Sequence, residues 1–147
     1  MIQMIQNPVF FGLEELLNSP TALAKKIPNL PSWEGVEKLK RLAVEILDPI
    51  RKKLGKPVHV GSGYRCPALN KAVKGAKNSQ HTQFEAADIE SDNNRELWDL
   101  VKKMVEDGEI VVGQLIWEYG TKQCPGWVHV SLPTEKHRNQ ILYIGVK

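Results

Sequence analysis

Three residues in the second half of the chain are of the types that hold a catalytic metal ion. His81 and Asp88 lie seven positions apart in one segment, and His129 follows far downstream. Two imidazoles and one carboxylate can bind zinc and leave its fourth position open to water. Zinc with an open position lowers the pKa of that water to about 7, which is the chemistry of a hydrolytic centre. The sequence therefore predicts a zinc site, provided that these three residues converge.

The neighbours of two of these residues favour a metal. Asp88 stands inside an apolar run and His129 stands between two valines, a pattern typical of half-buried strands. A buried carboxylate or imidazole is costly without a partner, and a metal ion would give both groups one. The alternative is that they hydrogen-bond to each other or to the backbone. Of the other histidines, His59 is expected at the edge of the core and His137 on a solvated loop.

Hydrophobic periodicity predicts the helices that must support these residues. Apolar residues recur at three- and four-residue steps over residues 36–54, which indicates an amphipathic helix that Pro49 bends or restarts. Ser32 is expected to cap the start of this helix and Gly55 its end. Further helical or apolar-periodic segments are expected at 10–17, at 67–73 and, after an Asp92 cap, through Met104 to Gly108.

Five β-prone runs accompany the helices, at residues 58–60, 86–89, 114–118, 127–132 and 141–146. A loop rich in glycine, proline and polar residues separates the third run from the fourth, so these two are predicted to be antiparallel neighbours. Helices come first and a sheet comes last, which favours an α+β fold. We expect a single domain over residues 1–147, with N-terminal helices packed on a small, mainly antiparallel sheet.

Composition excludes several classes of protein. The chain is 41% hydrophobic and 25% charged, as in globular proteins, and its net charge of +3 is too small and dispersed to favour nucleic-acid binding. No apolar run has the length of about 20 residues that a membrane span requires. Met1–Asn7 lacks the basic start and cleavage site of a secretory signal, so synthesis in the cytoplasm is expected. Cys66 and Cys124 are expected to be free thiols, with one bridge or a metal-side role for Cys124 as alternatives, and the protein is expected to be a monomer.

Three ordered motifs extend over most of the chain. They are Ser62-Gly63-Tyr64-Arg65 with Pro67 and Leu69-Asn70, then Ser79-x-His81 to Ala86-x-Asp88, and finally Trp127-Val128-His129-Val130-Ser131. With residues 14–29 and 114–118, these motifs resemble the zinc D-alanyl-D-alanine carboxypeptidases and related phage and bacterial cell-wall peptidases. The resemblance implies a Hedgehog-type fold and one zinc ion held by His81, Asp88 and His129. It also implies peptidoglycan peptides as substrate and action at the bacterial cell wall, as in a phage or prophage lysin.

The same resemblance implies roles for further residues. Arg65 would grip the substrate, because a guanidinium can pair with a carboxylate through two parallel hydrogen bonds or clamp a peptide carbonyl. A structural salt bridge is its alternative role. Ser79 would contact substrate or steady the loop of His81, or serve only as a turn residue. Trp127 or Trp117 could line the pocket, although tryptophan on a strand is more often in the core.

Two positions depart from the family pattern. Phe84 stands where members usually have glycine, so the loop after His81 is expected to differ locally. Gly126 stands where many members have the aspartate or glutamate that acts as general base, and loss of a base lowers catalysis by about 10²–10⁴-fold. Glu118 is the substitute that we favour, because its strand is expected to pair with the strand of His129. Its alternative is an exposed strand-end glutamate, and Glu85 and Glu90 are weaker substitutes that we expect to point away.

The sequence therefore supports a zinc-dependent metallopeptidase that hydrolyses peptide bonds of peptidoglycan stem peptides. A D-Ala-D-Ala carboxypeptidase and an endopeptidase of the endolysin type are equally compatible with it. The alternative is a catalytically impaired, zinc-containing module that binds the cell wall or has a structural role, as Gly126 suggests. A third reading, an interaction domain without metal, requires the three ligand residues to lie apart.

Overall fold

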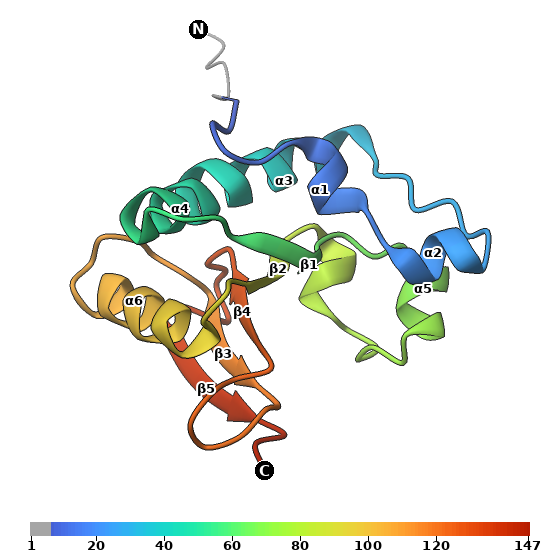
Figure 1. The fold of residues 1–147 in the computed structure, drawn as a ribbon. Coiled ribbons are helices and arrows are strands. Elements are labelled where there is room, and N and C mark those ends of the chain that lie inside the picture. Colours follow the sequence, from blue (N-terminus) through green and yellow to red (C-terminus); the bar gives the residue numbers. More distant parts are fainter. Residues whose placement is uncertain (1–6) are drawn as a thin grey trace, which may run out of the picture.

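The computed structural model describes residues 7–147. The prediction about a secretory signal therefore concerns residues that, apart from Asn7, lie outside this range. Figure 1 shows α1, α3 and α4 along one side of a twisted sheet, α6 on another, and α2 with α5 at the far end. The helices are α1 (Leu13–Leu17), α2 (Pro20–Ala24), α3 (Trp33–Leu42), α4 (Asp48–Leu54), α5 (Pro67–Ala72) and α6 (Asn94–Glu106), with a π-helical turn η1 (Ala43–Leu47) and a 3-10 turn η2 (Gln80–Gln83).

One five-stranded sheet contains all the strands of the described residues. They are β1 (His59–Ser62), β2 (Ala86–Glu90), β3 (Gln114–Glu118), β4 (Trp127–Ser131) and β5 (Gln140–Ile144), in the spatial order β1-β2-β4-β3-β5. The predicted antiparallel pairing of β3 with β4 is confirmed, and β2 pairs antiparallel with both β1 and β4. Only β5 runs parallel to its neighbour β3. The sheet is mixed but mainly antiparallel, and the α+β prediction is confirmed.

The long amphipathic helix forms in two pieces, as Pro49 suggested. Proline has no backbone N–H, and its ring clashes with the carbonyl four residues earlier. The chain passes through the π turn η1 just before this position and resumes as α4. Ser32 Oγ accepts a hydrogen bond from the backbone N–H of Gly35 in the first turn of α3. Gly55 ends α4 with φ +74°, in the left-handed region. Both predicted caps are therefore confirmed.

The predicted cap of α6 is wrong by one residue. The Asn93 side chain, not Asp92, accepts from the backbone N–H of Glu96 at 3.1 Å. The Asp92 carboxylate instead lies 2.6 Å from the ammonium of Lys56. Asp92 therefore forms an ion pair with Lys56, just after the end of α4, and the side-chain amide of Asn93 caps α6.

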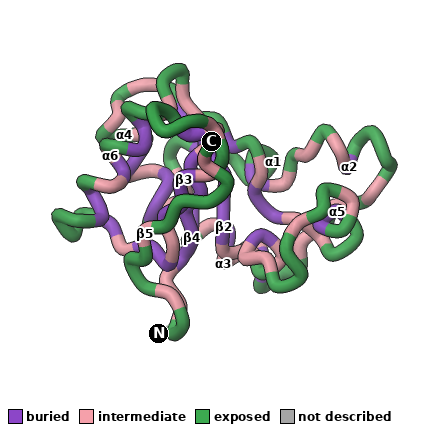
Figure 2. Tube along the Cα trace, turned by 90° about the horizontal axis from the view of Figure 1, so that it is seen from below, coloured by how far each residue is buried: buried purple, intermediate pink, exposed green. Residues whose placement is uncertain are grey.

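Strand alternation gives the central strands two different faces. Ala87 and Ile89 on β2 and Val128 and Val130 on β4 are fully buried in the main hydrophobic cluster, with helices α3, α4 and α6. Figure 2 shows this burial concentrated in β2, β3 and β4. The alternate residues of these strands face the other way, toward the pocket described below. No helix within residues 7–147 is long and apolar enough to cross a membrane.

Candidate metal centre

The register of β2 and β4 brings Asp88 and His129 face to face. The two are direct cross-strand partners, so their side chains leave the sheet on the same side. Both are buried, and His129 Nδ1 lies 3.2 Å from Asp88 Oδ1. The antiparallel pairing of β2 with β4 thus places together two residues that are 41 positions apart.

His81 reaches the same point from the 3-10 turn η2. Ser79 caps this turn, because its Oγ accepts from the backbone N–H of His81 at 3.1 Å. The ring of His81 is buried, and its Nδ1 lies 2.8 Å from the carbonyl oxygen of Gly63. A carbonyl only accepts, so Nδ1 carries the proton and Nε2 keeps a free lone pair. That Nε2 lies 3.3 Å from Asp88 Oδ1.

The donor set fits a metal ion such as zinc. One ligand atom from each of His81, Asp88 and His129 lies within 4.8 Å of the other two. Ligand atoms bound tetrahedrally at about 2.0–2.1 Å would be about 3.3 Å apart, the separation of each imidazole nitrogen from Asp88 Oδ1. Direct hydrogen bonding is a poorer account, because the lone pair of neutral His81 Nε2 faces a carboxylate oxygen, and a cation between them removes that repulsion.

The charge of this cluster favours an ionised Asp88. Burial works to raise the pKa of its carboxyl group. The positive charge that His81 carries when both of its ring nitrogens are protonated, together with hydrogen bonds from His129 and His81, outweighs burial, so the pKa of Asp88 lies below its ordinary range. A carboxylate that stays ionised at all physiological pH values is a suitable metal ligand.

Arg65 lies behind Asp88 and also faces the pocket. Its guanidinium donates to Ser62 Oγ at 3.0 Å, to Asn70 Oδ1 at 3.2 Å and to Asp88 Oδ2 at 3.5 Å. Five N–H donors are available on a guanidinium, so two remain for another partner. The structural salt bridge considered for Arg65 is therefore present, and the side chain also lines the pocket, so the substrate role is taken up below as a proposal.

Glu118 brings a second carboxylate to the centre. It ends β3, opposite Trp127, and its Oε1 lies 3.6 Å from His129 Nδ1. Its Oε2 accepts from Trp127 Nε1 at 3.0 Å. Burial, together with the negative charge of Asp88, raises the pKa of Glu118. The alternative of an exposed strand-end glutamate does not describe this half-buried side chain.

The other acidic positions lie elsewhere. Gly126 packs against the backbone of Glu118 in the β3–β4 connection and does not line the pocket. Glu85 lies 3.7 Å from the ammonium of Lys38, and Glu90 is opposite His59 on β1. Neither of them lines the pocket of the centre.

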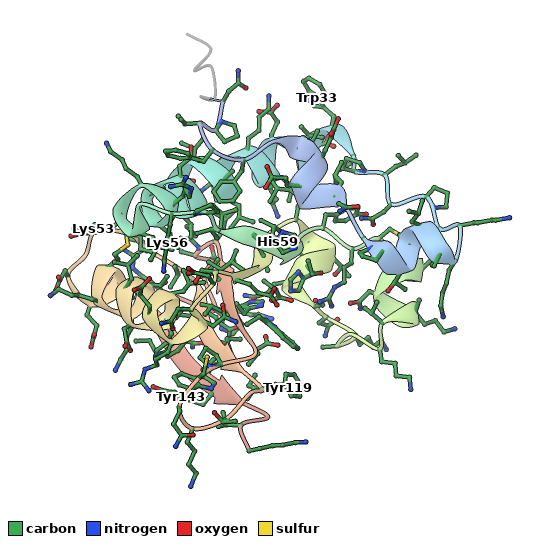
Figure 3. The ribbon with its side chains drawn as sticks, viewed as in Figure 1. Trp33, Lys53, Lys56, His59, Tyr119 and Tyr143 are labelled. Atoms are coloured by element: carbon green, nitrogen blue, oxygen red, sulfur yellow. The ribbon has the colours of Figure 1, made fainter. Side chains whose placement is uncertain are left out.

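The three candidate ligands and Glu118 line a pocket of about 590 Å³. We call its two sides the strand wall, formed by Asp88, Ile116, Glu118, Trp127 and His129, and the loop wall, formed by residues 73–81. Tyr119 lies at the rim, where its ring packs 5.1 Å from that of Trp127. Figure 3 shows Tyr119 and Tyr143 on the two sides of the sheet.

The structure corrects the placement of His137 and decides between the two tryptophans considered for the pocket. His137 does lie in the β4–β5 connection, but it is half-buried and lines the pocket, with Nδ1 2.9 Å from Gln140 Oε1. No ligand spacing marked it, because it is brought in by the parallel pairing of β5 with β3. Trp127 lines the pocket, whereas Trp117 is on the opposite face and packs edge-on against Trp98.

Phe84 keeps the backbone that glycine would adopt. Its φ is +61°, in the left-handed region. The ring stacks on Tyr64 with centroids 4.1 Å apart and occupies the space above Gly35, where a Cβ would clash with it. The expected local difference is therefore in the side chain, which ties the loop of His81 to α3 and to the Tyr64 segment.

Comparison with known proteins agrees with this geometry. A family model described as Peptidase M15 matches residues 11–131, which include every residue of the centre from Arg65 to His129. No curated protein matches the chain closely enough for comparison. The Cys66 and Cys124 thiols are both free, the first half-buried and the second exposed, and neither belongs to the ligand group. The chain belongs to the peptidase M15 family of metallopeptidases.

Proposed function

We propose that this protein is a zinc peptidase that hydrolyses peptide bonds in the stem peptides of bacterial peptidoglycan. One observation carries the proposal: a half-buried carboxylate, Glu118, lies beside a buried His-Asp-His set at the floor of an open pocket. A ligand set with a neighbouring base is the arrangement that metal-assisted hydrolysis requires.

His81, through Nε2, and His129, through Nδ1, would hold the zinc ion together with Asp88 Oδ1. Bound there, zinc supplies a Lewis acid that polarises a peptide carbonyl and lowers the pKa of water. Arg65 holds the second oxygen of Asp88, so the carboxylate keeps one oxygen for the metal. This contact orients a ligand in the way that outer partners of metal sites commonly do.

Glu118 acts as the general base and then as the general acid. Trp127 Nε1 donates to Oε2 and leaves Oε1 directed at the ligand group. Oε1 takes the proton of the attacking water and delivers it to the leaving amine. The raised pKa of Glu118 suits this exchange, because a base works best when its pKa approaches the working pH.

The loop wall supports recognition of an acidic peptide end. Arg65, which keeps two N–H donors beyond its bonds to Ser62, Asn70 and Asp88, and Lys74 both line the pocket. A free carboxylate can bind to such a pair of cations, and a stem peptide with a terminal D-alanine carries one. Ser79, which caps the turn of His81, also lines this wall and is a further substrate contact in this proposal.

The alternative of a catalytically impaired zinc module rested on Gly126. The position of Glu118, 3.6 Å from His129 Nδ1, argues against it, because a carboxylate from the neighbouring strand takes the place of the missing base.

The test is to measure zinc content and hydrolysis products on the same samples. Wild type should contain one zinc per chain and release product from peptidoglycan. Glu118→Gln should keep its zinc and lose about 10²–10⁴-fold in rate, because the amide cannot take a proton. The matched control is Glu90→Gln, on the same sheet but outside the pocket, which should hydrolyse normally.

The products also separate the two bond specificities. Free D-alanine indicates a carboxypeptidase, whereas new amino groups without free D-alanine indicate an endopeptidase. Zinc without hydrolysis in wild type would favour the binding module. A fully active Glu118→Gln would remove Glu118 as the base.

A further inference from the structure

The two histidines of the centre use different ring nitrogens. His81 faces Asp88 through Nε2, and its proton is fixed on Nδ1 by the carbonyl of Gly63. His129 faces Asp88 and Glu118 through Nδ1, at 3.2 and 3.6 Å. A neutral imidazole binds a metal only through the nitrogen without a proton, so His129 must carry its proton on Nε2.

The proton of His129 has two competing acceptors. On the Nδ1 side, Asp88 Oδ1 lies 3.2 Å away. If this oxygen accepted the proton's hydrogen bond, the proton would stay on Nδ1, the nitrogen that must be free to bind the metal. On the Nε2 side, the side-chain oxygen of Gln80 lies 2.9 Å away. A backbone carbonyl fixes the proton of His81, whereas within residues 7–147 the side-chain amide of Gln80 is the one acceptor at His129 Nε2.

Apart from its contact with His129, the side-chain amide of Gln80 has little to fix its orientation. Its Nε2 is buried and has no hydrogen-bond partner within the described part of the chain. If the amide turned over, its NH₂ group would donate to His129 Nε2, and the ring proton would move to Nδ1, toward Asp88. The orientation of Gln80 and the metal-binding form of His129 are therefore coupled.

We propose that Gln80 is a positioning residue that keeps the proton of His129 on Nε2 and so leaves Nδ1 free for zinc. This inference rests on the proposed zinc site. It extends that site to a residue of η2 that the fold brings within 2.9 Å of His129 on β4. Partners of this kind typically change metal affinity by about 10–100-fold when removed.

The experiment measures the zinc dissociation constant of metal-free protein by competition with a chromogenic chelator. Gln80→Met, which has similar length and no acceptor oxygen, should weaken zinc binding by about 10–100-fold. Gln80→Glu, which has only acceptor oxygens, should bind zinc at least as tightly as wild type. Gln83→Met is the matched control, because Gln83 is exposed on the same turn and its side-chain amide donates to Thr82 Oγ1 and not to a ligand residue. That variant should keep the affinity of wild type.

A second measurement needs no variant. Long-range ¹⁵N–¹H NMR spectra of the zinc-loaded wild type should show the His129 proton on Nε2 and the metal on Nδ1. The opposite assignment would overturn the proposal. Equal zinc affinity in wild type and Gln80→Met, or equal weakening in Gln80→Glu and Gln80→Met, would overturn it too. Absence of zinc from wild type would overturn the proposed function together with this inference, so the two failures are distinguishable.

Discussion

The two walls of the pocket position their functional groups by different means. On the strand wall, Asp88 and His129 are neighbours because β2 and β4 are in register, and no side-chain contact is needed to align them. On the loop wall, His81 depends on separate hydrogen bonds to Ser79 and to Gly63. Sheet register is a property of many backbone bonds at once, whereas a loop position is only as secure as its individual bonds.

The packing behind the walls differs in the same way. The strand wall lies on the main core, where Ile89 and Val128 are fully buried. The loop wall has no such support, and Val73 at its start is 39% exposed. It is anchored instead by the buried amide of Asn70, which donates to the carbonyl of Ala76 and accepts from Arg65. The strand wall should therefore control stability, and the loop wall should control how the site is tuned.

The largest effects should be the same on both walls, because all three ligands are needed for the metal. His81→Ala on the loop wall and His129→Ala on the strand wall should each reduce bound zinc to background and abolish hydrolysis, since two ligands hold zinc poorly. Metal analysis and product release measure both. His137→Ala, at a histidine that lines the same pocket outside the ligand group, should retain zinc. Full zinc in His81→Ala would show that the loop wall holds no ligand.

Stability should separate the walls. Ile89→Ala leaves a cavity behind the strand wall and should lower the free energy of unfolding by about 2–5 kcal/mol. Val73→Ala, on the half-exposed start of the loop wall, should change it by less than about 0.5 kcal/mol. Urea unfolding of metal-free protein measures both without a contribution from bound zinc. Similar losses in the two variants would mean that the loop wall is as much a part of the core as the sheet.

The strand wall was also the part that could be predicted from sequence. Asp88 and His129 stand in apolar, alternating runs, and that local pattern indicates buried strands and the face on which each residue lies. The pairing of β3 with β4 followed from the turn-rich loop between them. The parallel pairing of β5 with β3, and with it the place of His137, has no local signal, because it depends on long-range packing.

On the loop wall, sequence patterns indicated residues but not their contacts. Ser79 and Arg65 were singled out by resemblance, yet the bond from Arg65 to Asp88 joins segments 23 positions apart. Gln80 carried no signal of its own, because an amide next to a histidine is ordinary in a polar loop. Its contact with His129 spans 49 positions and exists only once η2 packs against β2, the strand next to β4.

The smallest effect that we expect tests the tuning role of the loop wall at Gly75. A Cβ added there would clash with Asn70 Oδ1 and approach Arg65 Nη1 to 2.9 Å, so Gly75→Ala should displace the Asn70–Arg65 hydrogen bond. A misaligned Arg65 would lose its hydrogen bond to the substrate, and a hydrogen bond to a charged group contributes about 1.5–3 kcal/mol. We therefore expect KM to rise by about tenfold or more, with a smaller change in kcat.

The matched control for this change is Gly61→Ala on β1. A Cβ at Gly61 meets only the carbonyl oxygen of Asp88 at an ordinary 3.9 Å, so its kinetics should match wild type. Zinc content should stay at one per chain in both variants, because neither glycine touches a ligand side chain. If Gly75→Ala lost zinc instead of substrate affinity, Arg65 would act on this site mainly through Asp88, and the loop wall would support the metal rather than the peptide.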